Sequence, residues 1–300
     1  MNILSFDLED WYQLVHRQMT GNLQSPRRSI FRQTDVLLEL LSIRRVRATF
    51  FVVGMLGRHF PELIRSISAQ GHEIASHGDA HRRVHELSLR EFKQDVCRSK
   101  ETLEDIVGKP VLGFRAPEFS INSGNLWALN VLAESGYLYD SSIFPIHHRR
   151  YGIPGFAVCP RCYELSSGSR IIELPLAAVS FAGLRIPVAG GGYFRALPLW
   201  ALRRALCRFE NLNVPMTTYF HPYEFDPVRL DLFRVVPANG WKQRISGWRV
   251  NWRNNLGRAG VRKKISALLE NHHFTTCQEY LYAVRFVENR ELLPATSPAV

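Results

Sequence analysis

The sequence predicts an α/β protein in which a parallel sheet is covered by helices. Two observations support one large domain of this class. Short apolar segments alternate with amphipathic helical patterns along most of the chain, and this alternation is typical of parallel sheets. The chain has 300 residues, of which 46% are hydrophobic, so it can bury the core of one large domain.

Six segments are expected to be strands because they are short, apolar and rich in β-branched or aromatic residues. They are residues 3–6 (ILSF), 47–53 (RATFFVV), 72–76 (HEIAS), 111–116 (VLGFRA), 170–176 (RIIELPL) and 216–221 (MTTYFH).

Helical patterns lie between several of these strands. They cover residues 61–70, 88–108, 123–136 and 257–271. The first begins at Pro61 and ends before Gly71, the usual asymmetry of helix ends. The segment 146–169 has no clear pattern and is expected to be a long loop, and the regular alternation stops after Pro227.

Polar side chains stand at the ends of four expected strands. Asp7 follows the first, His77 follows HEIAS, Arg115 follows VLGF and His221 closes MTTYFH. Because parallel sheets bind ligands at the carboxyl ends of their strands, these four residues are candidates for one catalytic site.

The pair His77 and His81 predicts a metal site. Two imidazoles four residues apart on a turn can share an ion, and two imidazoles with one carboxylate form a catalytic metal arrangement. Glu9 would supply the carboxylate if the first strand continues past Asp7, since alternate residues share a face. Asp10 would supply it if the chain turns after Leu8.

The five cysteines do not suggest a disulfide framework, because their number is odd and their spacing irregular. Cys159 and Cys162 form a CxxC without a second pair, so no structural zinc site is expected there. The first residues, MNILSFDLEDWYQ, lack a basic leader, and no run of about eighteen apolar residues occurs. A cytoplasmic protein is therefore expected.

The net charge of +11 suggests an anionic partner. Residues 241–269 hold eight Lys or Arg and no Asp or Glu, together with Trp241, Trp248 and Trp252. This stretch is either a patch that faces phosphates or lipid headgroups, or a solvated surface over packed tryptophans. No nucleic-acid recognition motif is present, so no nucleic-acid partner is expected.

Five motifs in order resemble those of the polysaccharide deacetylases, carbohydrate esterase family 4. They are FDLED (6–10), SHGDAH (76–81), RAPEF (115–119), YDSS (139–142) and YFHP (219–222). The wording GHEIASHG, YDSSIFP and AGGGYFR is similar to a subgroup encoded beside exosortase and exopolysaccharide genes. The resemblance runs from Asn2 to about Asp226.

The resemblance implies a distorted (β/α)7 barrel with a C-terminal extension. The expected divisions are a catalytic domain at 1–228, a basic extension packed on it at 229–285 and a flexible tail at 286–300.

The resemblance also implies residue roles. Asp7 would be the base, held ionised by Arg115, and His221 the general acid, oriented by Asp140. Substrate would contact Pro117, Phe119, Gly191 and Tyr193. One divalent ion is expected; Zn²⁺ suits the ligand set, and Co²⁺ or Ni²⁺ would also bind.

The implied function is a metal-dependent hydrolase that removes N-acetyl groups from an amino-sugar glycan or a lipid-linked exopolysaccharide precursor. Residues 241–269 would then contact an anionic membrane surface or a lipid-pyrophosphate carrier at the inner membrane face. Two alternatives stay open: a hydrolase of a cyclic amide that works without metal, and an inactive glycan-binding protein.

Overall fold

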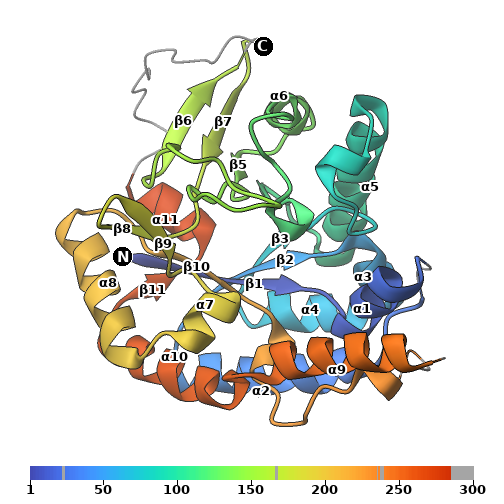
Figure 1. Ribbon diagram of the computed structural model, residues 1–300. Coiled ribbons are helices and arrows are strands. Elements are labelled where there is room, and N and C mark those ends of the chain that lie inside the picture. Colours follow the sequence, from blue (N-terminus) through green and yellow to red (C-terminus); the bar gives the residue numbers. More distant parts are fainter. Residues whose placement is uncertain (22–23, 166–167, 235, 237–239, 285–300) are drawn as a thin grey trace.

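A computed structural model describes residues 1–284 of the chain, apart from 22–23, 166–167, 235 and 237–239 (Figure 1). All six expected strands are confirmed. They are β1 (Asn2–Leu8), β2 (Thr49–Val52), β3 (Glu73–Ser76), β4 (Gly113–Phe114), β7 (Arg170–Glu173) and β10 (Thr217–Phe220). The sequence did not predict β5 (Tyr139–Asp140), β6 (Arg161–Glu164), β8 (Ala178–Phe181), β9 (Leu184–Pro187) or β11 (Phe274–Thr275).

Within the described residues the main sheet has nine strands. Their order is β10-β1-β2-β3-β4-β5-β7-β6, and β11 also pairs with β1. All neighbours are parallel except β6 and β7. Strand β6 lies inside the segment 146–169, which was predicted to be a loop, so that prediction was wrong for four residues.

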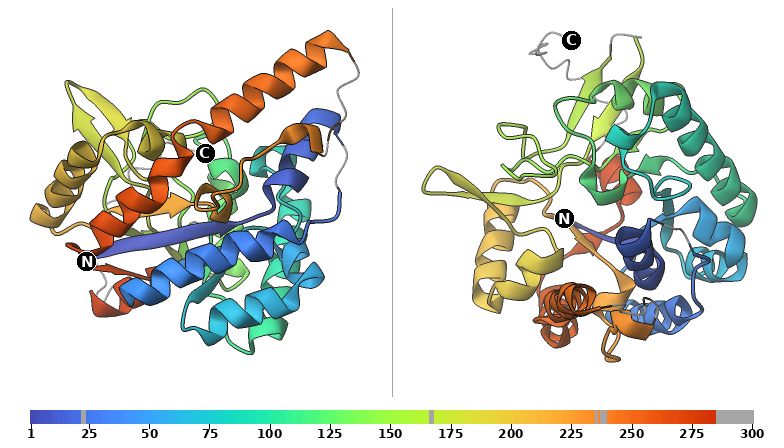
Figure 2. Two further views of the ribbon diagram at one scale, coloured as in Figure 1. Left: turned by 90° about the horizontal axis from the view of Figure 1, so that it is seen from below. Right: turned by 45° about the vertical axis from the view of Figure 1, so that its right-hand side comes forward.

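The sheet curls into a barrel that is not fully closed by strand pairing. Between β7 and β10 the gap is bridged by single backbone bonds. The N–H of Ala177 donates to Thr217 at 3.1 Å, and that of Tyr219 donates to Ala189 at 3.0 Å. Helices surround the curled sheet (Figure 2). The expected distorted α/β barrel is confirmed.

The described residues form eleven α-helices, of which four, at 61–69, 89–107, 127–134 and 261–269, lie within the predicted helical patterns and seven were not predicted. They are α1 (Trp11–Thr20), α2 (Ser29–Arg44), α3 (Gly54–His59), α4 (Pro61–Ala69), α5 (Leu89–Val107), α6 (Trp127–Glu134), α7 (Gly191–Ala196), α8 (Leu199–Asn211), α9 (Trp241–Asn255), α10 (Val261–Leu269) and α11 (Cys277–Ala283). Ser88 caps α5 by accepting from the N–H of Glu91. Helix α9 was not predicted.

Strand β11 and helix α11 cover the end of the barrel where the parallel strands begin, which we call the floor of the barrel. Strand β11 pairs with the start of β1, and the N–H of Cys277 donates to the hydroxyl of Thr49 at 2.8 Å. Tyr280 and Leu281 pack on the buried side chains of the strands. The expected extension at 229–285 therefore contributes its end to the barrel, while the expected tail at 286–300 lies outside the described residues.

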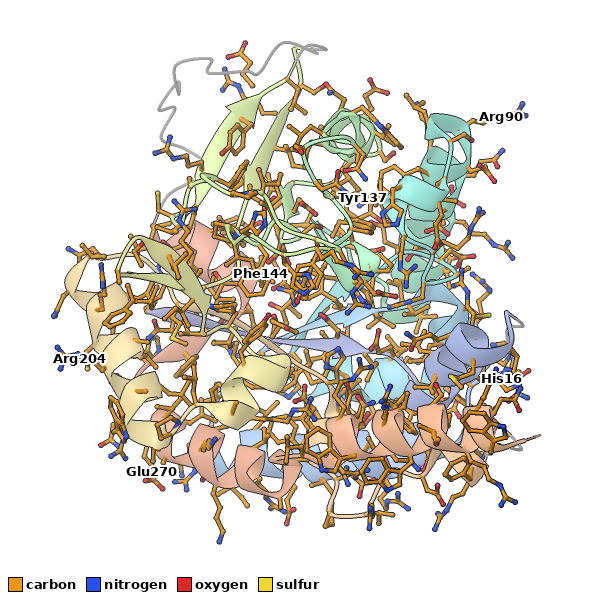
Figure 3. All side chains as sticks on the ribbon, in the orientation of Figure 1. His16, Arg90, Tyr137, Phe144, Arg204 and Glu270 are labelled. Carbon is orange, nitrogen blue, oxygen red and sulfur yellow. The ribbon has the colours of Figure 1, made fainter. Side chains whose placement is uncertain are left out.

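Apolar side chains fill the space between sheet and helices (Figure 3). Phe144, for example, is fully buried in the largest cluster of the core. The five cysteines are free thiols, as predicted. None of the described helices combines the length and apolar character needed to cross a bilayer.

Candidate active site

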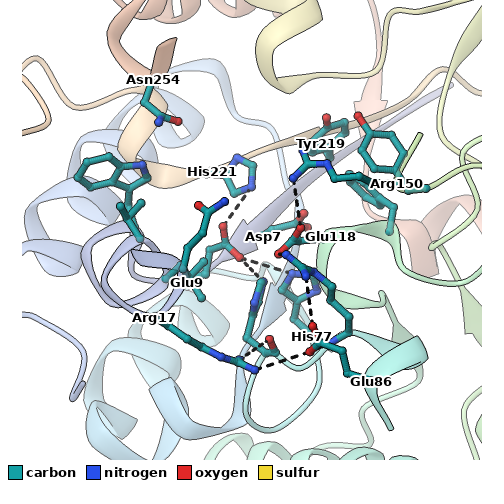
Figure 4. Close-up of a pocket in the computed structure, with 18 of the residues that line it drawn as sticks. Asp7, Glu9, Arg17, His77, Glu86, Glu118, Arg150, Tyr219, His221 and Asn254 are labelled. Carbon is teal, nitrogen blue, oxygen red and sulfur yellow. Dashed lines mark hydrogen bonds and ion pairs between the residues drawn. The ribbon is translucent and has the colours of Figure 1, made fainter. Parts of the chain in front are cut away.

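The carboxyl ends of β1, β3 and β10 open into a pocket of about 500 Å³ (Figure 4). Asp7, Glu9, His77, His81 and His221 all line it. The side chains that the sequence assigned to strand ends therefore meet, as the rule for parallel sheets predicts.

Glu9, His77 and His81 form a buried cluster whose ligand atoms all lie within 4.8 Å of one another. A carboxylate oxygen of Glu9 is 2.7 Å from Nε2 of His81 and 3.7 Å from Nε2 of His77. Two imidazole nitrogens and one carboxylate are the donors that a catalytic zinc site uses. The cluster therefore fits a divalent ion, with Glu9 as the carboxylate.

A backbone carbonyl fixes the imidazole of His77. Its Nδ1 lies 2.8 Å from the carbonyl oxygen of Arg115. A carbonyl can only accept, so Nδ1 carries a proton, and Nε2 is the nitrogen turned toward Glu9. Such an outer partner is the usual companion of a metal-binding histidine.

His81 adopts a left-handed backbone conformation that residues other than glycine rarely adopt, with φ of 51°. The surroundings hold it there, because Arg17 of α1 donates to the carbonyl of His81 at 2.9 Å and to that of Ala80 at 3.1 Å. Strain of this kind is concentrated at functional sites. The loop thus presents both imidazoles to Glu9 at a cost in backbone energy.

The charge of Glu9 is stabilised inside the protein. Burial alone would raise the pKa of this carboxyl, but the positive charges of His81 and His221 and the hydrogen bond from His81 outweigh it. The pKa of Glu9 is therefore well below its usual value, and the carboxylate stays ionised.

Asp10, the other carboxylate that the sequence left open, does not join this cluster. It caps α1 instead: its oxygens accept from the N–H of Tyr12 at 3.2 Å and that of Arg27 at 2.8 Å. Burial raises the pKa of Asp10 to about 6. Strand β1 ends at Leu8, and Asp10 is the N-cap of α1, so its carboxylate faces the first turn of that helix while Glu9 faces the histidines.

Arg115 is fully buried and holds Asp7, as predicted. Its Nη1 donates to Asp7 at 2.8 Å and to the hydroxyl of Ser5 at 2.8 Å. The other guanidinium nitrogens donate to the carbonyl and hydroxyl of Ser141, each at 2.9 Å. A guanidinium bonded on all sides is rigid, so it fixes the position of the Asp7 carboxylate.

His221 is oriented by Glu224, a residue that the sequence analysis missed. Nδ1 of His221 lies 2.9 Å from a carboxylate oxygen of Glu224, and Nε2 lies 3.3 Å from Glu9. Burial alone would lower the pKa of His221, but the charges of Glu9 and Glu224 and the hydrogen bond to Glu224 raise it to about 9. The spacing His-x-x-Glu after a strand was the signal available.

The prediction that Asp140 orients His221 was wrong. Asp140 accepts from the hydroxyl of Ser142 at 2.5 Å and from its N–H at 3.2 Å. It also faces Glu173, and burial of both carboxyls raises the pKa of each. Asp140 ends β5, which pairs with β4 and β7, and the partners of its carboxyl are Ser142 and Glu173 rather than His221.

The four predicted substrate contacts have different positions. Phe119 lines the pocket, whereas Pro117, Gly191 and Tyr193 do not. Gly191 instead leaves room for the hydroxyl of Tyr219, which would lie 2.7 Å from an added Cβ. Gly190 and Gly191 thus let the chain approach Tyr219 of β10 closely, and neither lines the pocket.

Four arginines that the sequence did not single out also line the pocket. They are Arg17, Arg83, Arg150 and Arg253. Two pocket carboxylates, Glu86 and Glu118, lie within 4.0 Å of the first three. These residues come from unrelated loops and helices, so no local pattern marks them.

Two family profiles match the chain in succession. A profile for the polysaccharide deacetylases matches residues 31–138, and one for a domain of unknown function, DUF3473, matches residues 141–282. His77 and His81 fall in the first region and His221 in the second.

Curated relatives match over part of their length. The chitooligosaccharide deacetylase of Sinorhizobium fredii is 28% identical over 147 residues, which is 49% of this chain and 60% of that protein. The peptidoglycan deacetylase of Helicobacter pylori is 30% identical over 109 residues, 36% of each. The chain thus spans less than two thirds of either relative.

Solved structures with the same fold cover nearly the whole chain. A Mycobacterium smegmatis protein classed as a polysaccharide deacetylase has a TM-score of 0.64 at 21% identity, over 99% of this chain and 94% of that one. Puue allantoinase has a TM-score of 0.60 at 14% identity, over 96% and 91%. The solved structures show that the chain has this fold, and the matching profile shows that residues 31–138 form a polysaccharide deacetylase domain.

Proposed function

We propose that the protein is a metal-dependent hydrolase that removes N-acetyl groups from amino-sugar glycans. The observation that carries this proposal is the convergence of Glu9, His77 and His81 with Asp7 and His221 in one pocket. The related chitooligosaccharide and peptidoglycan deacetylases support the same class of substrate.

The metal would be held by Glu9, His77 and His81, and Zn²⁺ is our proposed ion. When bound, a divalent ion polarises a carbonyl oxygen and makes a water more acidic. The protein's own contribution is to keep Glu9 ionised and to turn Nε2 of both histidines toward the same point.

Asp7 and His221 would move the protons. Asp7, held by Arg115, accepts a proton from the attacking water. His221, held by Glu224, gives a proton to the leaving nitrogen as the amide C–N bond breaks. The products are acetate and a free amino sugar, and the atoms balance with one water consumed.

The finer substrate that we propose is a lipid-linked exopolysaccharide precursor on the cytoplasmic side of the inner membrane. Arg17, Arg83, Arg150 and Arg253 around the pocket suit a phosphate or pyrophosphate next to the sugar. The free thiols of all five cysteines suit a reducing compartment.

The test measures metal content and acetate release side by side. Wild type, a His77→Ala/His81→Ala double variant and the exposed-site control His59→Ala are dialysed against zinc and analysed by mass spectrometry. We expect about one ion per chain in wild type and the control and none in the double variant. Acetate release from chitooligosaccharide should fall to background in the double variant alone.

Two outcomes would contradict the proposal. Wild type that holds no ion after dialysis against zinc would refute the metal mechanism and favour a metal-free hydrolase of a cyclic amide. Wild type that holds the ion but releases no acetate from any acetylated amino sugar would favour a binding protein.

A further inference from the structure

Helix α9 exposes a continuous apolar stripe to solvent. Trp241, Ile245, Trp248 and Trp252 are between 47% and 68% exposed. Their spacings of four, three and four residues place them on one face, since each residue advances about 100° around a helix. The helix lies along the outside of the molecule (Figures 1 and 2). Apolar patches of this kind mark interaction sites.

The side of α9 next to this stripe is polar or small, and it is fixed to the protein. Asn251 accepts from the N–H of Leu232 at 2.7 Å. Asn255 both accepts from and donates to the backbone of Leu230. Gly247 packs on the ring of Phe233 so closely that an added Cβ would lie 2.7 Å from it. These contacts fix the helix with its apolar stripe exposed, and rotation about its axis would break them.

Basic side chains flank the stripe on both sides. At about 100° per residue, Lys242 and Arg249 lie on one flank and Arg244 on the other. All three are exposed. By contrast, Arg258 and Lys264, which belong to the same basic stretch of sequence, point inward and donate to backbone carbonyls.

We propose that α9 docks on the surface of an anionic lipid bilayer. Tryptophans beside Lys and Arg on a surface helix are the composition that binds at the headgroup level, and the basic flanks complement anionic headgroups. A second copy of the chain is a poorer occupant. Two copies that met through this stripe would bring Lys242, Arg244 and Arg249 against the same charges.

The docking helix is also part of the pocket. Arg253 and Asn254 of α9 line it (Figure 4), and the carbonyl of Asn254 is bonded to Arg195. Docking would therefore bring the pocket to headgroup level, where a lipid-linked sugar could enter it; this last step rests on the proposed function.

The test is sedimentation of the full chain with phosphatidylcholine vesicles, with and without phosphatidylglycerol. We expect binding to the anionic vesicles that weakens with salt. Lys242→Glu/Arg244→Glu/Arg249→Glu should lower the partition coefficient on the order of 10²-fold or more. Trp241→Ser/Trp248→Ser/Trp252→Ser should lower it at least about tenfold. The control is Trp200→Ser, at a 70% exposed tryptophan of α8, which should bind like wild type.

Three outcomes would overturn the inference: wild type that stays in the supernatant, stripe variants that sediment like wild type, or a dimer by light scattering that the tryptophan variant abolishes. The proposed activity is measured separately, as acetate release from soluble chitooligosaccharide. Both the charge-reversal variant and the tryptophan variant should retain this activity. Vesicle binding without acetate release in wild type would refute the activity and leave the docking inference standing.

Discussion

Acidification should destabilise this protein through His72, the residue that precedes β3. His72 is buried, and its Nδ1 accepts from the N–H of Ala48 at 3.2 Å. Burial, assisted by the charge of Arg47, lowers the pKa of His72 to about 4. In the unfolded chain the pKa returns to about 6.5. The folded state therefore prefers the neutral ring, and His72 stabilises it fully only above the unfolded pKa.

The size of the effect follows from these two pKa values. At pH 5 the unfolded chain has taken up a proton that the folded chain has not, which lowers the free energy of unfolding by about 2 kcal/mol relative to pH 7. We expect His72→Asn, whose amide oxygen can replace Nδ1 as acceptor but does not titrate, to lose about 2 kcal/mol less than wild type over this range.

Urea unfolding followed by circular dichroism at pH 7, 6 and 5 measures this difference. Other groups titrate in the same range, but they do so in both proteins and cancel in the comparison. The control His59→Asn changes an exposed histidine and should follow wild type. If wild type and His72→Asn lost stability in parallel, the reasoning would be refuted.

Three further predictions follow from contacts at the site and in the basic stretch. Glu224→Gln should lower kcat roughly 10²-fold with little change in KM, because His221 loses its carboxylate partner. The kcat of Asp140→Asn should stay within a few-fold of wild type. A larger loss in Asp140→Asn than in Glu224→Gln would instead support Asp140 as the partner of His221. Gly190→Ala would place a Cβ against the backbone oxygen of Tyr219 and should cost about 3 kcal/mol or more of stability in urea unfolding. Gly192→Ala, whose Cβ would meet nothing closer than 3.7 Å, should change stability by less than about 1 kcal/mol; equal effects would contradict the packing argument. Arg258→Met should cost about 3 kcal/mol by the same measurement, because three carbonyls lose a donor. Arg262→Met, which removes an exposed ion pair with Glu39, should cost less than about 1 kcal/mol, and a larger loss there would count against this division of the basic stretch.

The residues at strand ends could be predicted because buried parallel strands leave a plain record in the sequence. Each apolar run ends where the chain leaves the core, so the polar residue that follows lies at the mouth of the barrel. Asp7, His77 and His221 line the pocket for this reason, and Arg115 pairs with Asp7 beside it.

The apolar segments do not, by contrast, indicate which strands are neighbours in the sheet. The role expected for Asp140 rests on the family resemblance alone, whereas its strand pairs with β4 and β7 and its carboxyl contacts Ser142 and Glu173. The partner of His221 is Glu224, held by the turn Pro222–Glu224 (η3). The partner of His221 therefore lies three residues away in the same turn, and not in the distant YDSS motif.

Helix α9 shows a second limit. The spacing of its tryptophans and Ile245 fits a helix, yet an apolar stripe is normally taken to face a core. Here the contacts of Gly247 and Asn251 decide which side faces the protein. The interpretation that the tryptophans pack beneath a solvated surface was therefore wrong.

The floor of the barrel has a consequence for how the protein is made. Strand β1 begins at Asn2, yet its neighbours β10 and β11 are separated from it by more than 200 residues of chain. During synthesis, one side of β1 has no partner until β10 emerges, and the floor has none until α11 follows. Unpaired strand edges of this kind promote aggregation. We therefore expect the barrel to close only after α11 has been synthesised, and shortened chains that stop before residue 274 to depend on chaperones.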